Sequence, residues 1–322
     1  MVQRTRASPE LKMMTWKHYR QVKLDPETLP PVKPRYSLTG DILGFRRCRR
    51  QYGFFGVRGY VPSHAVQLFY GTLVHEVLDR VHKHYKGLDN LATAGTIPTD
   101  NEIETYFNEA ENALRAKNIR VFDTRQAKHV LKQFNKIEGP DLYPRVIDTE
   151  HRVQGDRDTH IVEGVIDVLV DAETKSREPS EVEIWDYKAA KFPIKNPHDL
   201  ANYRYQMLVY SALYKIKNRC YPKRAVLYFM NELAPDSVKA RPKNALYSIN
   251  LTETEIQRAL KEFDKTALAI QKCKDRNQWT PPKKDEMPML EDTCAPCDIR
   301  WSCSSFAKHA QRKGHVHQVP RP

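Results

Sequence analysis

The fold of this chain is decided by two short segments, Gly164-Val-Ile-Asp167-Val-Leu-Val170 and Glu183-Ile-Trp-Asp186-Tyr-Lys188. Both are rich in β-branched and aromatic residues, which is typical of buried strands. Each segment also carries an acidic residue among apolar neighbours. If the two strands pair, Asp167 and Asp186 meet at one point. Because side chains alternate along a strand, Asp186 and Lys188 are expected on the same face.

These three side chains supply the groups that hydrolysis of a phosphodiester requires. Carboxylate oxygens bind Mg²⁺ or Mn²⁺, and a lysine orients the attacking water or stabilises developing negative charge. An isolated Asp-x-Lys is more often a strand end with an ion pair. The helix predicted to follow carries Gln206 and Tyr210 on one face, since they are four residues apart. Their simpler interpretation is a core tyrosine beside a surface glutamine.

An earlier predicted helix carries His75, whose imidazole could bind a metal or contact a substrate. A single helical histidine is more often a partly buried structural residue, and we assign that role to His82 and His84. Glu76 and Glu163 adjoin candidate residues. They are alternatives as secondary ligands, although a structural or solvent-facing role is more common for such carboxylates.

The order of the predicted elements is helices, then a mixed sheet with an inserted helix, then a segment that carries cysteines. A helix start is also expected at Ser37, where the segment Ser37-Leu-Thr-Gly-Asp41 resembles an N-terminal cap. The predicted helices span residues 69–85, 102–114, 126–134, 200–217 and 253–273, and the predicted strands span 146–153, 161–170, 181–187, 225–230 and 246–249.

We therefore expect one folded domain between two polar ends. The proline-containing segment 1–35 is predicted to be a flexible arm, and the basic segment 304–322 a loose tail. Within the domain, residues 36–145 are expected to be mainly helical, 146–250 to form the sheet and its helix, and 251–303 to form a helix and the cysteine triplet.

The composition favours a polyanionic partner and argues against a membrane protein. Lys and Arg number 53 against 40 Asp and Glu, which gives a net charge of +13. No apolar run approaches the ~20 residues that span a bilayer, and no signal-peptide core is visible. We expect a cytoplasmic protein whose six cysteines are metal ligands and packing residues, not disulfides.

Three of the cysteines form a C-x₂-C-x₅-C pattern, at Cys294, Cys297 and Cys303, while Cys48 lies far away in the sequence. Zinc sites more often use two close pairs. The alternative is that the triplet binds zinc with a histidine such as His309, and that Cys48 is a buried packing residue. Cys220 and Cys273 lack a partner at ligand spacing, and we expect them to be packing residues.

The segment around Cys48 is basic and aromatic. Such a surface can guide a single strand by phosphate contacts and base stacking. An equally good interpretation is a solvated helix face. The candidate nucleic-acid contacts are Arg46, Arg47, Arg49, Arg50 and Tyr52, with Phe54 and Phe55 beside them.

The ordered set His75, Asp167, Asp186-x-Lys188 and Gln206-x-x-x-Tyr210 resembles the motifs of the RecB-type branch of the PD-(D/E)XK nuclease superfamily, over about residues 37–303. The resemblance implies a restriction-endonuclease-like α/β fold with a central mixed sheet flanked by helices. It implies that His75, Asp167, Asp186 and the Tyr187 carbonyl bind Mg²⁺ or Mn²⁺, that Lys188 assists catalysis, and that Gln206 and Tyr210 shape the site. Ile166 stands where the superfamily name has a proline, which this branch commonly lacks.

A distant cysteine joined to a C-terminal triplet is similar to the iron-sulfur site of AddB-type nucleases and CRISPR-associated adaptation exonucleases. This resemblance implies a [4Fe-4S] cluster on Cys48, Cys294, Cys297 and Cys303, with structural Zn²⁺ as the alternative. It also implies a metal-dependent deoxyribonuclease, an exonuclease on single strands or DNA ends, in repair or defence.

Two other hypotheses stay open. One is an iron-sulfur DNA-binding or scaffold subunit of a helicase or defence complex, with an idle nuclease site. The other is a zinc-containing endonuclease that acts on duplex DNA.

Overall fold

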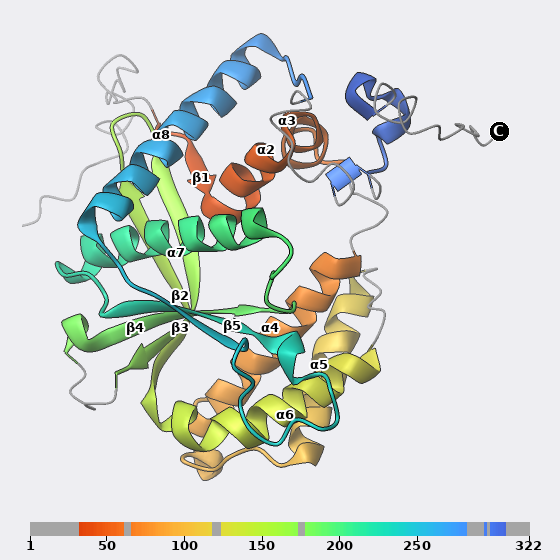
Figure 1. Ribbon diagram of the computed structural model, residues 1–322, viewed down its shortest axis with the longest axis vertical. Coiled ribbons are helices and arrows are strands. Elements are labelled where there is room, and N and C mark those ends of the chain that lie inside the picture. Colours follow the sequence, from red (N-terminus) through yellow and green to blue (C-terminus); the bar gives the residue numbers. More distant parts are fainter. Residues whose placement is uncertain are drawn as a thin grey trace, which may run out of the picture. The chain divides into compact units, whose positions relative to one another are not determined.

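The computed structural model describes residues 32–60, 66–117, 124–172, 178–281, 293–294 and 297–306. The chain divides into two units, residues 1–34 and 35–322, and every described helix and strand belongs to the second (Figure 1). Most of the expected arm and tail lies outside the described residues, as does His309. No described helix combines the length and apolarity needed to cross a membrane.

A six-stranded mixed sheet forms the centre of the second unit. Its main path runs β1-β3-β4-β5-β6, and β2 pairs with β3. The pairs β1–β3 and β4–β5 are parallel, whereas β2–β3, β3–β4 and β5–β6 are antiparallel. The strands are β1 Arg35–Ser37, β2 Val146–Asp156, β3 Ile161–Asp171, β4 Val182–Lys188, β5 Arg224–Phe229 and β6 Leu246–Ile249.

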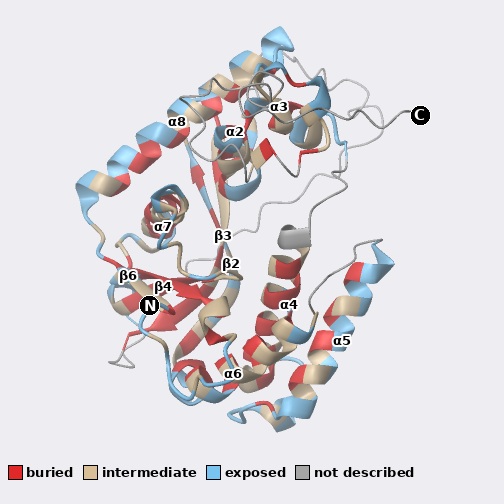
Figure 2. Cartoon of the chain, turned by 45° about the vertical axis from the view of Figure 1, so that its right-hand side comes forward, coloured by how far each residue is buried: buried red, intermediate tan, exposed pale blue. Residues whose placement is uncertain are grey.

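Helices cover both faces of this sheet, which explains why β4 is buried along nearly its whole length (Figure 2). One apolar core joins the sheet to α4 Val66–Lys86, α5 Asp100–Ala116 and α6 Thr124–Leu142. The other joins it to α7 Pro197–Asn218 and α8 Glu253–Arg276. Helix α7 lies between the sheet and α8, and all its residues from 205 to 214 are buried. The expected α/β class, with a mixed sheet between helices, is confirmed.

Strand β3 pairs with three other strands, and part of one of its edges is left unpaired within the described residues. One edge pairs with β2 along most of its length. The other edge pairs with β1 at residues 161–163 and with β4 at residues 168–171. Between these pairings, residues 164–167 have no strand partner on that edge within the described chain. Asp167 therefore lies where β3 and β4 begin to separate.

The packing of β3 changes side at the same point. Ile166 belongs to the core under α7, whereas Val168 belongs to the core under α4. Residues two apart normally share a face of the sheet, so the regular alternation is interrupted at Asp167. The carboxylate consequently lies between the two cores.

The helix starts follow the expected capping chemistry. Thr252 caps α8 by accepting a hydrogen bond from the Glu255 amide. Ser37 caps the first helical turn by accepting from the Asp41 amide, and Asp41 accepts in return from the Ser37 amide. The three-residue strand β1 ends at this same serine and was not expected, because three residues show no period.

Candidate active site

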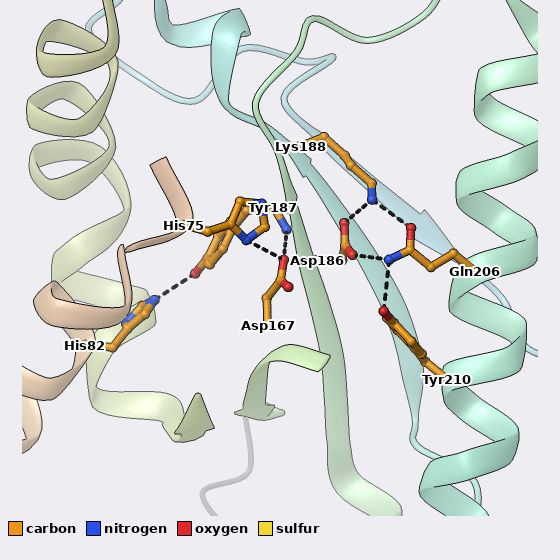
Figure 3. Close-up of polar contacts among 8 residues, drawn as sticks. All are labelled: His75, His82, Asp167, Asp186, Tyr187, Lys188, Gln206 and Tyr210. Atoms are coloured by element: carbon orange, nitrogen blue, oxygen red, sulfur yellow. Dashed lines mark hydrogen bonds and ion pairs between the residues drawn. The ribbon is translucent and has the colours of Figure 1, made fainter. Parts of the chain in front are cut away.

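Asp167 is the meeting point of a helix and two strands (Figure 3). Its Oδ2 accepts a 2.7 Å hydrogen bond from the Tyr187 amide of β4 and lies 3.3 Å from Nδ1 of His75 on α4. The Tyr187 amide is free for this contact because the β3–β4 backbone ladder ends at the pair Val168–Trp185. The separation of the strands thus leaves a backbone donor that a regular sheet would use in its own ladder.

Asp186 is the centre of a second group, on the α7 side (Figure 3). Its Oδ2 lies 2.6 Å from the Lys188 ammonium, and its Oδ1 accepts a 2.7 Å hydrogen bond from the Gln206 amide. Gln206 also accepts from Lys188 at 2.8 Å and donates to the Tyr210 hydroxyl at 3.2 Å. Asp186 and Lys188 lie on one face, as expected, and Gln206 is a 4% exposed site residue, not a surface one.

A glycine explains how Tyr210 reaches this group. A Cβ on Gly164 would lie 2.5 Å from Cε1 of Tyr210, which is far inside van der Waals contact. Gly164 belongs to the stretch of β3 that lacks a strand partner on one edge, and the ring packs against that stretch. The glycine of Gly-x-x-Asp therefore makes space for the tyrosine of Gln-x-x-x-Tyr.

Helix α4 positions the other side through three polar side chains on the face that meets the sheet. His75 contacts Asp167 of β3, and Asp79 accepts a 2.9 Å hydrogen bond from Thr149 of β2. His82, one turn further, contacts the Tyr187 hydroxyl of β4 at 3.0 Å, and the two rings stack. The positions i, i+4 and i+7 lie on one helix face, so α4 fixes three strands at once.

The structural role expected of His84 fits its contacts with the Tyr106 and Thr96 hydroxyls. His82 was expected to be structural as well, but its hydroxyl partner belongs to a site residue.

Glu150 of β2 is a member of the site that sequence reasoning missed. One ligand atom each from His75, Glu150 and Asp167 lie within 4.8 Å of one another. Glu150 has a left-handed backbone with φ of 49°, which costs a non-glycine residue about 1–2 kcal/mol. The two glutamates considered from the sequence lie elsewhere: Glu76 pairs with Arg80 at 2.8 Å, and Glu163 pairs with Arg35.

Burial and neighbouring charges shift the pKa values of Asp186 and Asp167 in opposite directions. Burial raises the pKa of Asp186 and Lys188 lowers it, and with the nearby charge of Asp167 the result is a pKa of about 6. Burial also raises the pKa of Asp167, but His75 and Lys188 outweigh it and hold that pKa below its usual range. Both carboxylates are paired with cationic side chains, and a bound divalent cation would take over part of that pairing.

The pKa values of His75 and Glu150 are both raised. Burial lowers the pKa of His75, but the charge and hydrogen bond of Asp167 raise it to about 9. Glu150 is an exposed residue, and partial burial of its carboxylate together with the Asp167 charge raises its pKa to about 7. The donor set of carboxylates with one imidazole fits a divalent cation such as Mg²⁺ or Mn²⁺.

The four cysteines that were expected to bind a cluster are all buried, with exposed fractions of 6–9%. They lie close enough for the charges of Cys48, Cys297 and Cys303 to raise, together with burial, the pKa of Cys294 to about 12. Two side chains beside Cys48 tie the segments together. Arg50 donates to the Ser302 hydroxyl at 3.1 Å, and Gln51 donates to the Thr293 carbonyl at 2.8 Å.

The remaining two cysteines, Cys220 and Cys273, pack against the α7 and α8 core.

The basic segment near Cys48 is partly committed to internal contacts. Arg46 lies over the Tyr205 ring at 4.4 Å and Arg49 over the Phe45 ring at 5.7 Å, although both of these residues and Arg47 are exposed. Tyr52 is 5% exposed, and its hydroxyl donates to Asp41 at 2.7 Å. Because this ring is buried, we remove it from the set of residues that could stack on a base.

A family model described as the PD-(D/E)XK nuclease superfamily matches residues 41–304, which agrees with this geometry. A comparison with curated proteins found no match. Among solved structures, a crystal structure described as a candidate exonuclease from Eubacterium rectale shares 13% identity, covers 94% of this chain and 97% of that chain, and has a TM-score of 0.49.

Proposed function

The chain belongs to the PD-(D/E)XK nuclease superfamily, and we propose that its site hydrolyses DNA phosphodiester bonds with bound Mg²⁺ or Mn²⁺. We further propose an exonuclease of the RecB-type branch that acts on single strands or free ends, in repair or defence, alongside a helicase or another subunit of a defence complex. One observation carries the proposal: Asp167 and Asp186 lie on adjacent strands that separate beside Lys188.

The proposed ligands are His75, Asp167, Asp186 and the Tyr187 carbonyl. When bound there, the cation would activate a water and neutralise charge on the scissile phosphate. Lys188 is 2.6 Å from Asp186 and 2.8 Å from Gln206, so its ammonium is fixed at the point where a water or phosphate oxygen would approach. Its side chain is 14% exposed, which leaves one side open to a substrate.

Gln206 and Tyr210 would orient these groups without contacting the reacting atoms. The Gln206 amide fixes both partners of the Asp186–Lys188 pair, because its oxygen accepts from one and its nitrogen donates to the other. A fixed ammonium loses less mobility when the transition state forms. We propose that this bridge sets the direction in which Lys188 points.

We also propose a [4Fe-4S] cluster on Cys48, Cys294, Cys297 and Cys303, with Zn²⁺ as the alternative. Four buried thiols from two distant segments match in number the ligands of such a cluster, which supports the proposal. Because burial and neighbouring sulfurs oppose ionisation of Cys294, thiolates there need a metal to stabilise them. The cluster would join the start and end of the domain next to the exposed Arg47 and Arg49.

The nuclease proposal is tested with protein purified without oxygen. Linear single and double strands labelled at the 5′ or 3′ end, a circular single strand and a labelled RNA are incubated with Mg²⁺ or Mn²⁺. We expect degradation of linear DNA from an end and no cleavage of the circle or the RNA. Cleavage of the circle would replace the exonuclease by an endonuclease. DNA binding without cleavage in either metal would support an idle scaffold subunit instead.

A further inference from the structure

Glu150 occupies a place in the sheet that brings its side chain to Asp167. In the antiparallel pair of β2 and β3, Thr149 is opposite Val168 and His151 is opposite Ile166. Glu150 and Asp167 are the two residues between these pairs. Opposed residues of an antiparallel pair project to the same side, and the carboxylates of both lie within 4.8 Å of His75 and of each other.

The backbone on both sides of Glu150 is held in the sheet, because Thr149 and His151 pair with residues of β3. Thr149 donates from its hydroxyl to Asp79 of α4 at 2.9 Å, and the His151 ring contacts Asp148 at 2.6 Å. The carboxylate of Glu150 itself makes no hydrogen bond or ion pair within the described part of the chain. An anchored carboxylate with no protein donor of its own is suited to bind a cation.

The surroundings of Glu150 form a small pocket. Its lining includes His75, Asp79, His82, Glu150, Asp167 and Tyr187. His82 is 1% exposed, and its Nδ1 lacks a hydrogen-bond partner among the described residues. Buried polar atoms normally have a partner. The unpaired nitrogen therefore indicates a hydrogen-bonding ligand, such as a water bound to a cation. Three carboxylates and two imidazoles line this space, which is of ion or water size.

We propose that Glu150 is a direct ligand of the divalent cation, at a position formed by His75, Glu150 and Asp167 on the β2 side of the site. The proposal rests on the proposed function, because the cation is the one used there. It assigns Asp167 as the shared residue: one side faces the His75–Glu150 position, and the other faces Asp186 and Lys188. One nitrogen and two carboxylates leave other coordination positions for water and phosphate.

Manganese is the probe of choice, since an imidazole in the ligand set suits Mn²⁺ better than Mg²⁺. Binding of Mn²⁺ to the full chain without DNA is measured by electron paramagnetic resonance or calorimetry. We expect Glu150→Gln to weaken binding at least about tenfold, as loss of a charged ligand should. The matched control is Glu111→Gln, which removes the same charge from a residue of α5 that pairs with Arg115 at 2.8 Å outside the cluster. It should bind Mn²⁺ like the wild type.

Glu150→Gly separates ligation from a structural role. Glycine adopts a φ of 49° without strain, so this variant should be at least as stable as the wild type in EDTA. Its melting temperature should nevertheless rise less when Mn²⁺ is added. If both Glu150 variants lose stability in EDTA, the residue is structural and the proposal of direct ligation is overturned.

Asp167→Asn distinguishes failure of this inference from failure of the proposed function. Wild-type Mn²⁺ affinity in Glu150→Gln, with binding and cleavage lost in Asp167→Asn, overturns the role of Glu150 alone. Wild-type affinity and cleavage in Asp167→Asn would overturn both.

Discussion

The amide of Tyr187 donates a 2.7 Å hydrogen bond to the carboxylate of Asp167 across the point where β3 and β4 separate. This bond replaces a rung of the backbone ladder by a side-chain contact. It brings the peptide that follows Asp186 next to the carboxylate of Asp167. The geometry of the site is therefore a consequence of how the sheet opens, and substitutions that alter the opening should alter the chemistry.

Replacing Gly164 by alanine should displace Tyr210, because the new Cβ would lie 2.5 Å from the ring. We expect a loss of about 1–3 kcal/mol in the free energy of unfolding, the usual cost of overpacking a core, together with reduced cleavage. A second change, Tyr210→Leu, should restore much of the stability but not the activity. Urea unfolding measures the stability of the single and the double variant, and degradation of end-labelled DNA measures their activity.

The matched control is Gly71→Ala in helix α4. The nearest atom to its new Cβ is the Cβ of Ala189, which is 4.0 Å away. Alanine favours a helix over glycine by about 1 kcal/mol, so this variant should be as stable as the wild type or more so. Equal losses for both alanines would contradict the packing of Tyr210 on Gly164.

Gln206→Glu should destabilise the site in a pH-dependent way. The change removes the donor to Asp186 and Tyr210 and places a second carboxylate beside Asp186. At pH 8 we expect a cost of about 2–4 kcal/mol, the range for a buried unpaired polar or charged group. At pH 5 the cost should be smaller, because one carboxyl can be protonated. Unfolding curves with the same cost at both pH values would disagree with the bridging role of Gln206.

His82 should contribute to acid sensitivity. Burial lowers the pKa of His82 from 6.5 to about 4. Since the pKa is lower in the folded chain, the stabilisation is complete above pH 6.5 and is lost as the pH falls through 4. The lost free energy would be about 3 kcal/mol. Between pH 7 and pH 4, His82→Gln should therefore lose less stability than the wild type by roughly this amount in EDTA. Parallel curves for the two proteins would exclude the assignment.

Cys294→Ser should remove the metal that we propose between the two cysteine-bearing segments. We expect loss of the brown absorption near ~400 nm and a melting temperature lower by more than about 5 °C. Cys220→Ser is the control, because Cys220 packs against the α7 core and should leave both properties unchanged. A colourless wild-type protein that contains zinc would replace the iron-sulfur cluster by the zinc alternative.

Much of the catalytic sheet could be predicted because its signal is local. The buried strands around Asp167 and Asp186 have long apolar runs, and alternation alone places Asp186 and Lys188 on one face. The face shared by Gln206 and Tyr210 follows equally from helical spacing. These features depend on residues that are neighbours in the sequence.

Other features depend on contacts between distant segments. Strand β1 has only three residues and is defined by its pairing with β3. Glu150 joins the site through the register of β2 and an uncommon left-handed backbone, in a strand that is largely polar. The role of His82 follows from its position above Tyr187, which a single helical histidine does not reveal. Burial of Tyr52 likewise depends on Asp41 and on the helical packing around it.

Whether the Asp186–Lys188 pair carries out the reaction is tested by comparing cleavage by the wild type, Asp186→Asn and Lys188→Ala in Mn²⁺. Asp186→Asn preserves the size of the side chain, and Lys188→Ala shortens it. Each removes a charge that we propose lies at the reacting phosphate. We expect end-labelled linear DNA to be degraded by the wild type, and both variants to be slower by at least about a hundredfold while they still fold and bind DNA. Cleavage at the wild-type rate by either variant would contradict the claim that the Asp186–Lys188 pair carries out the reaction.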